Sequence, residues 1–325
     1  MRRGAALAIA GVAGIVAGCS DAHSTMNPNT GEAARIAGLG WAMFAASGAV
    51  FALVLGLLIP ALLRRDRRAE PSELARGDRR WVILAGIVLP SVVVLSLSAA
   101  TVWALGEDSG PPELHISVLA HQYWWEVRYD GTTAVTANEI HIPVGRTVQL
   151  QLDSADVIHS LWVPELGPKR DLIPGRTNLL TWRAREPGEF RGQCAEYCGM
   201  QHANMAVDVI VDPPDVFDDW LRHEAADAVA PVSPEATAGE RAFSSEPCAA
   251  CHTIRGTAAA GTSGPDLTHF AERRTIGAGT VINNRGHLGG WIANSQTLKR
   301  GNLMPPIPLT PDELRSLLSY LEGLR

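Results

Sequence analysis

Four side chains that bind soft metal ions lie within twelve consecutive residues of this 325-residue chain: Cys194, Cys198, His202 and Met205. Sulfur ligands favour copper over hard cations, and a single blue-copper ion would need only one cysteine, two histidines and a weak methionine. Because a second cysteine is present, two thiolates can bridge two copper ions. His159 is the best source of the second imidazole. The alternatives are a disulfide or a zinc knot, although zinc knots rarely include methionine.

A second reactive group, Cys248-Ala-Ala-Cys251-His252, has the spacing at which two cysteines attach haem through thioether bonds. The adjacent histidine is placed to ligate the iron. A lone C-x-x-C motif could instead be a redox disulfide or half of a zinc site. Two later segments, Gly264-Pro-Asp-Leu and Asn302-Leu-Met304-Pro, argue against both alternatives, because with the first motif they resemble class I cytochrome c.

The resemblance to class I cytochrome c implies roles for further residues. His252 and Met304 would be the axial ligands of the iron, and the carbonyl of Pro265 would orient the histidine ring. His269 and His287 are rival sixth ligands. Histidine and methionine together raise the iron potential, which suits electron transfer rather than oxygen chemistry.

The elements that must position these residues can be read from the apolar patterns. Short alternating runs separated by Gly, Pro and Asp predict a β-sandwich over residues 113–212. Residues 213–233 are expected to form a linker, since the Pro- and Ala-rich stretch 225–234 has linker composition. Residues 234–325 predict a small helical domain, whose last helix opens with the capping box Thr310-Pro-Asp-Glu313.

The beginning of the chain has the composition of a membrane anchor. Residues 1–18 resemble a secretory signal, and the small residues before Cys19 resemble a bacterial lipoprotein box, so Cys19 is expected to carry lipid. The alternative is an ordinary signal followed by a chance cysteine. The uncharged runs 36–63 and 81–105 are each long enough to cross about 30 Å of hydrocarbon. Seven arginines in residues 64–80 place the loop between them in the cytoplasm. Both ends of this hairpin then lie outside.

The net charge also differs between the N-terminal membrane-like part of the chain and the residues that follow it. The formal net charge is −6, but residues 106–325 contain 28 acidic and 18 basic side chains. This acidity disfavours nucleic acid as a partner and suits basic proteins. No glycine-rich phosphate loop stands out in the sequence.

Residues 35–215 resemble subunit II of cytochrome c oxidase, the subunit that contains the CuA centre. The likeness rests on the cysteine loop and on three further stretches: His121-Gln-Tyr-Trp-Trp, Asp156-Val-Ile-His159-Ser and Lys169-Arg-Asp-Leu-Ile-Pro-Gly-Arg176. Together with the haem motif, it implies a multidomain membrane protein. Its parts would be a two-helix transmembrane hairpin, a cupredoxin-like β-sandwich and a small all-α cytochrome c domain.

The same resemblance implies a ligand set for two copper ions. Cys194 and Cys198 would bridge the ions. The terminal ligands would be His159, His202, Met205 and the backbone carbonyl of Glu196. The Glu196 carboxylate would also bind a magnesium ion shared with subunit I, unless it is simply a solvated acid.

One position departs from the family pattern. The family commonly has tryptophan two positions after the histidine of its aromatic stretch, where external cytochrome c delivers electrons. This chain has Tyr123 there, followed by Trp124 and Trp125. All three are candidates for receiving electrons, although buried aromatic side chains more often serve packing.

The function implied is that of an electron-transfer subunit. Electrons would pass from the fused haem c to CuA and on to subunit I, where oxygen reduction and proton translocation take place, so this chain contributes no catalytic residue. Expected partners are subunits I and III, membrane lipid, and a soluble or membrane-bound cytochrome c or upstream respiratory complex. Asp78 resembles a family acid at the mouth of a proton channel, unless it is simply a solvated ion-pair partner of Arg76, Arg79 and Arg80.

These expectations place the protein in the bacterial inner membrane, with the copper and haem domains on the periplasmic side. A copper chaperone is the main alternative function, but it needs an exchangeable site rather than a closed ligand set. A nitrous oxide reductase-like enzyme would need many more histidines than the ten present.

Overall fold

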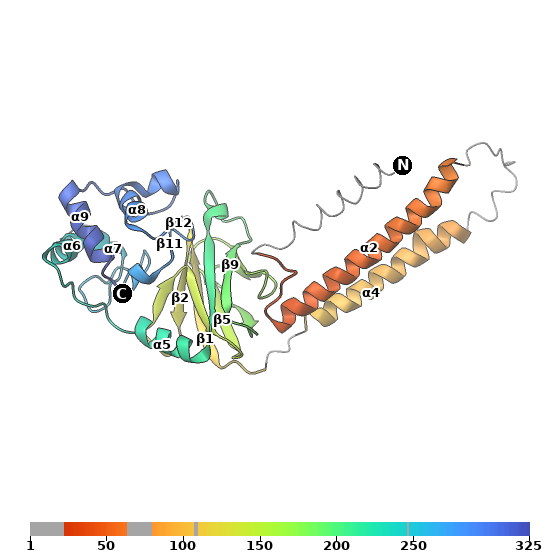
Figure 1. The fold of residues 1–325 in the computed structure, drawn as a ribbon, viewed down its shortest axis with the longest axis horizontal. Coiled ribbons are helices and arrows are strands. Elements are labelled where there is room, and N and C mark those ends of the chain that lie inside the picture. The colour runs from red at the N-terminus through yellow and green to blue at the C-terminus, as the bar shows by residue number, and fades with distance from the viewer. Residues whose placement is uncertain (1–22, 64–79, 107–109, 246) are drawn as a thin grey trace, which may run out of the picture.

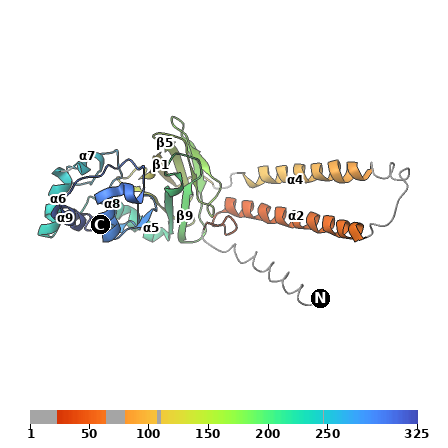
Figure 2. The same cartoon turned by 90° about the horizontal axis from the view of Figure 1, so that it is seen from above.

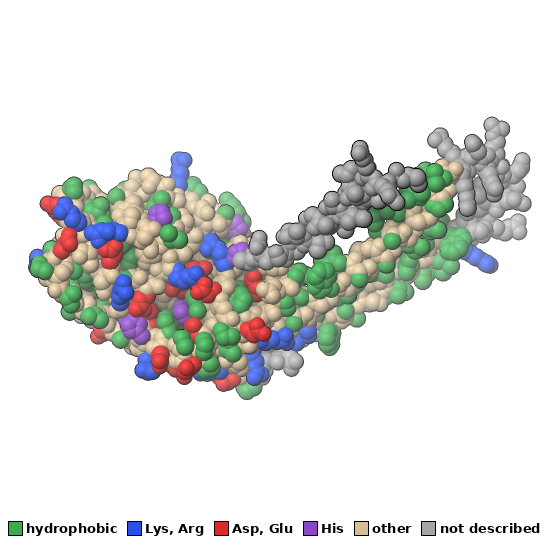
Figure 3. Space-filling view, viewed as in Figure 1, with side chains coloured by type: hydrophobic (Ala, Val, Ile, Leu, Met, Phe, Trp, Pro, Cys, Tyr) green, Lys and Arg blue, Asp and Glu red, His purple; other side chains and the backbone are tan. Residues whose placement is uncertain are grey.

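Two long helices form a hairpin at one end of the molecule (Figures 1 and 2). The structure, a computed structural model, describes residues 23–63, 80–106, 110–245 and 247–325. Helix α2 spans Gly31–Leu63, and the second helix runs from Arg80 through the π-helical turn η1 (Leu84–Val88) into α4 (Leu89–Ala104). Both are long and apolar enough to cross a membrane. Their apolar side chains are exposed, whereas charged side chains gather on the globular part (Figure 3).

Helix α2 begins at Gly31 rather than at the predicted residue 36. The reason is a cap that hydropathy does not reveal, since the Thr30 hydroxyl accepts a hydrogen bond from the Ala33 amide at 3.1 Å. The same hydroxyl donates to the carbonyl of Leu166 at 2.9 Å. The cap therefore also attaches the hairpin to the neighbouring domain.

The middle domain consists of two five-stranded sheets, in the orders β3-β2-β1-β5-β8 and β4-β10-β9-β6-β7. The first sheet contains β1 (Leu114–His121), β2 (Trp124–Tyr129), β3 (Val135–Ala137), β5 (Val148–Ser154) and β8 (Asn178–Trp182). The second contains β4 (Glu139–Pro143), β6 (His159–Trp162), β7 (Arg170–Leu172), β9 (Gly188–Cys194) and β10 (Ala206–Asp212). Buried and partly exposed positions alternate along β1 and β5, as a sandwich requires.

Part of the expected linker is a helix. Helix α5 spans Pro214–Glu224 and packs against the sandwich. Phe217 is fully buried, and the Trp220 ring stacks on His141 with ring centroids 3.9 Å apart. These apolar residues, with Leu221, recur at helical spacing. The linker expectation of 213–233 is therefore too long, because its first half belongs to the sandwich core.

The last side chain of α5, Glu224, is only 4% exposed, and burial raises its pKa to about 8 against the partial opposition of Arg273 and Arg255. Folded protein then keeps this proton over a pH range in which unfolded chain has lost it. We expect the Glu224 contribution to the free energy of unfolding to fall as the pH rises from about 4.5 to about 8, with a limiting slope of about 1.4 kcal/mol per pH unit. Glu224→Gln should become progressively more stable relative to the unaltered protein over this range. Thermal unfolding of residues 110–325 at several pH values measures this difference, and a constant difference would contradict it.

The C-terminal domain is small and mainly helical. Its elements are α6 (Pro234–Ser245), α7 (Cys248–Cys251), η3 (Phe270–Glu272), β11 (Thr275–Ile276), β12 (Val281–Ile282), α8 (Arg285–Leu298) and α9 (Pro311–Leu321). The predicted capping box of Thr310 and Glu313 is confirmed. Helices α6 and α9 cross so closely that a Cβ atom at Gly239 would lie 2.0 Å from the carbonyl oxygen of Ser316. The sequence did not predict the short β11–β12 hairpin.

Candidate metal and haem centres

The predicted copper ligands converge at one edge of the second sheet. Strands β6 and β9 pair antiparallel, with Leu161 opposite Cys194, and this register brings His159 beside the cysteine loop. The loop between β9 and β10 then folds back, since the Cys194 amide donates to the Met205 carbonyl at 2.9 Å. A short helix, η2 (His202–Asn204), completes the loop.

The donor atoms within this loop lie close to one another. The two cysteine Sγ atoms are 3.8 Å apart. His159 Nδ1 lies 3.9 Å from Cys194 Sγ, and His202 Nδ1 lies 3.8 Å from Cys198 Sγ. Met205 Sδ is 4.0 Å from Cys198 Sγ, and the Glu196 carbonyl oxygen is 3.2 Å from Cys194 Sγ. Each sulfur thus has its own imidazole, which suits two ions that share both thiolates.

Burial and hydrogen bonds prepare the donors for metal binding. His159 and Met205 are fully buried, and the two cysteines are nearly so. The hydrogen bond between the two cysteine side chains lowers the Cys194 pKa to about 3, and the same hydrogen bond raises the Cys198 pKa far above its ordinary value. Metal ligation needs deprotonated thiols, so the site already favours one thiolate.

Asp156 positions the His159 ring from the other side. Its carboxylate accepts a hydrogen bond from His159 Nε2 at 2.8 Å, which leaves Nδ1 facing the cysteine. Burial lowers the His159 pKa, but hydrogen bonds to Cys194 and Asp156 outweigh it and raise the pKa overall. A carboxylate behind a ligating histidine fixes its orientation and tautomer.

The three aromatic candidates for receiving electrons have different surroundings. The Tyr123 hydroxyl accepts from the Met200 amide at 3.1 Å and supports the cysteine loop. Trp125 is fully buried and packs edge-on against His159, with ring centroids 6.1 Å apart. Trp124 is partly exposed and stacks on His121 instead. Tyr123 and Trp125 therefore contact the candidate copper site, whereas Trp124 stacks on a histidine that is not one of the candidate ligands.

The side chain and the backbone carbonyl of Glu196 lie in different surroundings. Its carboxylate lies 3.5 Å from Lys169 Nζ, and both side chains are about half exposed. The carboxylate is therefore accessible to a neighbouring subunit, while the carbonyl faces the cysteine sulfur.

The haem motif lies on α7, and His252 follows it directly. The ring Nδ1–H donates to the Pro265 carbonyl at 2.8 Å, which leaves Nε2 for iron. Burial lowers the His252 pKa and favours the neutral form that ligates. A Cβ atom at Gly264 would lie 2.7 Å from the His252 ring, so only glycine leaves room for this orientation.

Met304 is held by its own surroundings. Its sulfur accepts a hydrogen bond from Trp291 Nε1 at 3.1 Å, and its amide donates to Asn302 Oδ1 at 2.9 Å. The two rival histidines also have hydrogen-bond partners, each through one ring nitrogen. His269 Nε2 donates to the Ala226 carbonyl at 3.1 Å, and His287 Nδ1 lies 3.0 Å from the Ile282 carbonyl. These residues fit a haem group with histidine and methionine ligands.

Sequence reasoning missed the residues that join the two domains. Gln201 Nε2 donates to the Arg300 carbonyl at 2.5 Å, and the Ala206 amide donates to the Ala278 carbonyl at 3.0 Å. Lys299 also reaches from one domain to the other. Each contact uses a backbone carbonyl, which any residue type supplies, so no sequence motif could have indicated them.

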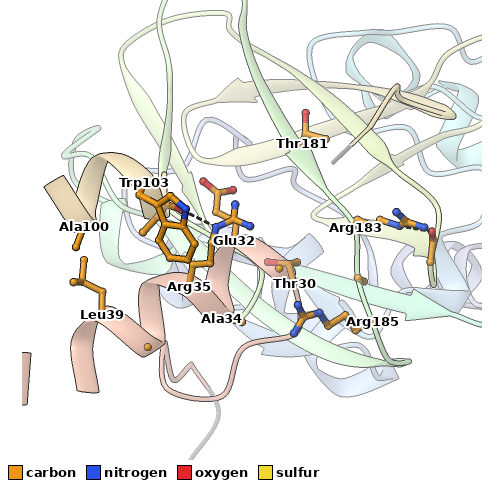
Figure 4. A pocket seen from close by; sticks show the side chains of 15 residues that line it. Thr30, Glu32, Ala34, Arg35, Leu39, Ala100, Trp103, Thr181, Arg183 and Arg185 are labelled. Atoms are coloured by element: carbon orange, nitrogen blue, oxygen red, sulfur yellow. Dashed lines mark hydrogen bonds between the residues drawn. The ribbon is translucent and has the colours of Figure 1, made fainter. Parts of the chain in front are cut away.

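A separate cavity of about 850 Å³ lies where the hairpin meets the sandwich (Figure 4). Arginines 35, 183 and 185 and Trp103 contribute to its lining. Arg35 donates to the carbonyls of Ala104 and Gly106, at 3.1 and 2.6 Å, and so joins the outer ends of the two helices. None of the predicted metal or haem residues lines this cavity. Cys19, Asp78 and the loop 64–79 lie outside the described residues.

Comparison with known proteins identifies the families of the two outer domains. The family model "Cytochrome C oxidase subunit II, periplasmic domain" matches residues 132–212, and the model "Cytochrome c" matches residues 236–325. Cytochrome c oxidase subunit 2 of Alkalihalophilus pseudofirmus is 36% identical over 249 residues, which cover 75% of this chain and 72% of the relative. The Bacillus subtilis protein of the same name is 30% identical over 257 residues, with the same two coverages.

A solved structure, the periplasmic domain of subunit II of cytochrome oxidase of Bradyrhizobium japonicum, is 29% identical and covers 37% of this chain and 100% of its own, with a TM-score of 0.35. A membrane hairpin, a cupredoxin-like domain and a cytochrome c domain on one chain define an electron-transfer subunit of a haem–copper oxidase. The chain belongs to the cytochrome c oxidase subunit 2 family, and so to an oxidoreductase complex.

Proposed function

We propose that this chain relays electrons from a cytochrome donor, through its own haem c and then through CuA, to subunit I. The proposed copper ligands are His159, Cys194, the Glu196 carbonyl, Cys198, His202 and Met205. The proposed haem attachments are Cys248 and Cys251, with His252 and Met304 as axial ligands. When bound, each centre supplies a one-electron couple.

The observation that carries this proposal is the direct packing of the two ligand loops. Gln201, next to His202, bonds the carbonyl of Arg300 in the loop that leads to Met304. Met200 packs against Gly301, where an added Cβ atom would lie 2.6 Å from the methionine sulfur. Gly301 also has a φ of +86°, which glycine adopts freely. The haem loop therefore lies against the copper loop without an intervening layer.

This packing explains the departure at Tyr123. Its carbonyl accepts a hydrogen bond from Lys299 of the haem domain, so the segment that receives external cytochrome in the family is covered here. A built-in haem domain makes an external docking site on that segment unnecessary. We propose Tyr123 and Trp125 as parts of the route between the centres, because both contact the copper site.

The remaining roles follow from the resemblance. We propose subunits I and III as partners, with a magnesium ion held between the Glu196 carboxylate and subunit I. Cytochrome c or an upstream respiratory complex would supply electrons to the haem domain on the periplasmic side. Cys19 would carry lipid at the bacterial membrane, and Asp78 would lie at the mouth of a proton channel.

Deletion of residues 226–325 tests the relay. We expect the shortened chain in the assembled oxidase to keep two copper ions, because α5 and the sandwich core are retained. Its copper centre should be reduced by external cytochrome c at a small fraction of the usual rate. Metal analysis and stopped-flow absorbance measure both properties. Undiminished reduction of copper would overturn the proposed order of electron transfer.

A further inference from the structure

A single lysine of the haem domain reaches across to the copper domain. Lys299 follows α8 and is only 2% exposed. Its ammonium group donates to the carbonyls of Tyr123, Asn204 and Gly277, at 2.9, 2.7 and 2.7 Å. Two of these acceptors belong to the copper domain and the third to the β11–β12 turn. All three ammonium protons are therefore used, and they join three segments.

Burying the Lys299 ammonium group without a carboxylate partner costs free energy. Among the ion pairs of the described residues, none includes Lys299. Burial lowers its pKa to about 7, which reflects the free energy lost when an ammonium group leaves water. A neutral apolar side chain would fill the same volume without this cost. The three carbonyls, in turn, would lose their donor if such a residue replaced the lysine.

Two of the three segments that Lys299 joins adjoin the candidate copper ligands. Asn204 lies between His202 and Met205, and the Tyr123 hydroxyl supports the same loop by accepting a hydrogen bond from the Met200 amide. On the haem side, the Lys299 carbonyl accepts from Asn302 Nδ2 at 2.7 Å. Asn302 Oδ1 in turn accepts from the Met304 amide at 2.9 Å. One residue thus contacts both ligand loops.

We propose that Lys299 is a positioning residue that locks the haem domain onto the copper loop and so fixes the relation between the two centres. The effect of Lys299 on electron transfer rests on the proposed relay, whereas its effect on the docking of the two domains does not. Neutral Lys299→Met matches the length of the stem and leaves the carbonyls without a donor. Lys299→Arg keeps the charge, but its planar group cannot point three protons at three converging carbonyls.

Hydrogen exchange in the full-length protein, with copper and haem bound, tests the lock. The amide of Ala206 donates to the Ala278 carbonyl, and the amide of Arg274 donates to the Glu139 carboxylate at 2.9 Å, so both report whether the domains are docked. In Lys299→Met we expect these two amides to exchange about tenfold faster or more, from the loss of hydrogen bonds to a charged donor. The matched control is Arg300→Met, which removes the adjacent exposed cation, keeps the backbone carbonyl that accepts from Gln201, and should leave exchange unchanged.

A second readout follows electrons inside the protein. After the haem has been reduced, copper reduction should be slower in Lys299→Met than in the unaltered protein, because the relation between the two centres is no longer fixed, while haem reduction by the donor stays unchanged. If Lys299→Met loses copper or haem, Lys299→Arg provides the test, with a smaller increase in exchange. Exchange in both Lys299 variants equal to that of Arg300→Met would overturn the lock. Absence of copper reduction in the unaltered protein would instead overturn the relay, and the exchange result would stand independently.

Discussion

Replacing Cys198 with serine should abolish the dinuclear copper centre and leave the haem domain intact. The copper content should fall from two ions per chain to one or none. The absorption that arises from thiolate–copper charge transfer should disappear or change to that of a single-thiolate site. Metal analysis and electron paramagnetic resonance of the purified protein measure these changes.

The reason lies in the distances around the two sulfur atoms. Each Sγ has a separate imidazole at 3.8–3.9 Å, and the two sulfurs are 3.8 Å apart, so either ion depends on both cysteines. A serine hydroxyl is a hard and weakly acidic ligand that does not replace a soft bridging thiolate. Haem spectra should be unaffected because the helical domain has a hydrophobic core of its own.

Met200→Leu is the matched control for this substitution. Met200 is a sulfur-containing residue of the same loop, but its side chain is 68% exposed and belongs to none of the close donor contacts. The control variant should retain two copper ions. A Cys198→Ser protein that also retained two ions with unaltered spectra would contradict the bridging role.

The convergence of the proposed copper ligands in one loop could be predicted because they are rare residue types at short spacing. His159 is a different case, since it lies 35 positions before Cys194. The β6–β9 pairing that brings them together is a long-range contact that spacing does not indicate. The need for a second imidazole singled out His159, and the resemblance to a known family supported the choice. Pro265 could likewise be singled out only through the resemblance to class I cytochrome c, because every residue has a backbone carbonyl.

Features that depend on the backbone of a distant segment could not be predicted. The Thr30 cap, which makes α2 begin earlier than hydropathy indicates, depends on the position of the Thr30 hydroxyl between the Ala33 amide and the Leu166 carbonyl. Helix α5 was not predicted, because the prolines at its start suggested a linker. Phe217 and Trp220 do have the spacing of apolar residues on one face of a helix. Lys299 has no signature at all, because its three acceptors are backbone carbonyls far apart in sequence.

Replacing Met304 with histidine should lower the reduction potential of the haem by more than about 0.1 V, within the range of roughly 0.8 V that axial ligands control. A thioether stabilises reduced iron, and exchange for an imidazole favours the oxidised form. The loop should accommodate the change because Met304 is only partly buried and its neighbour Leu303 is 76% exposed. A redox titration followed by haem absorbance gives the potential directly.

Two kinds of control separate ligation from packing. Trp291→Phe removes the hydrogen bond to the Met304 sulfur but keeps the ligand, so it should shift the potential much less than Met304→His. His269→Gln and His287→Gln remove the rival ligands and should leave the iron spectrum unchanged. An unaltered potential in Met304→His, together with an altered spectrum in either glutamine variant, would transfer the sixth ligand to that histidine. A lowered haem potential makes electron transfer from an external cytochrome to the haem less favourable. The potential of the copper centre should not change, because the proposed copper ligands belong to a separate hydrophobic core.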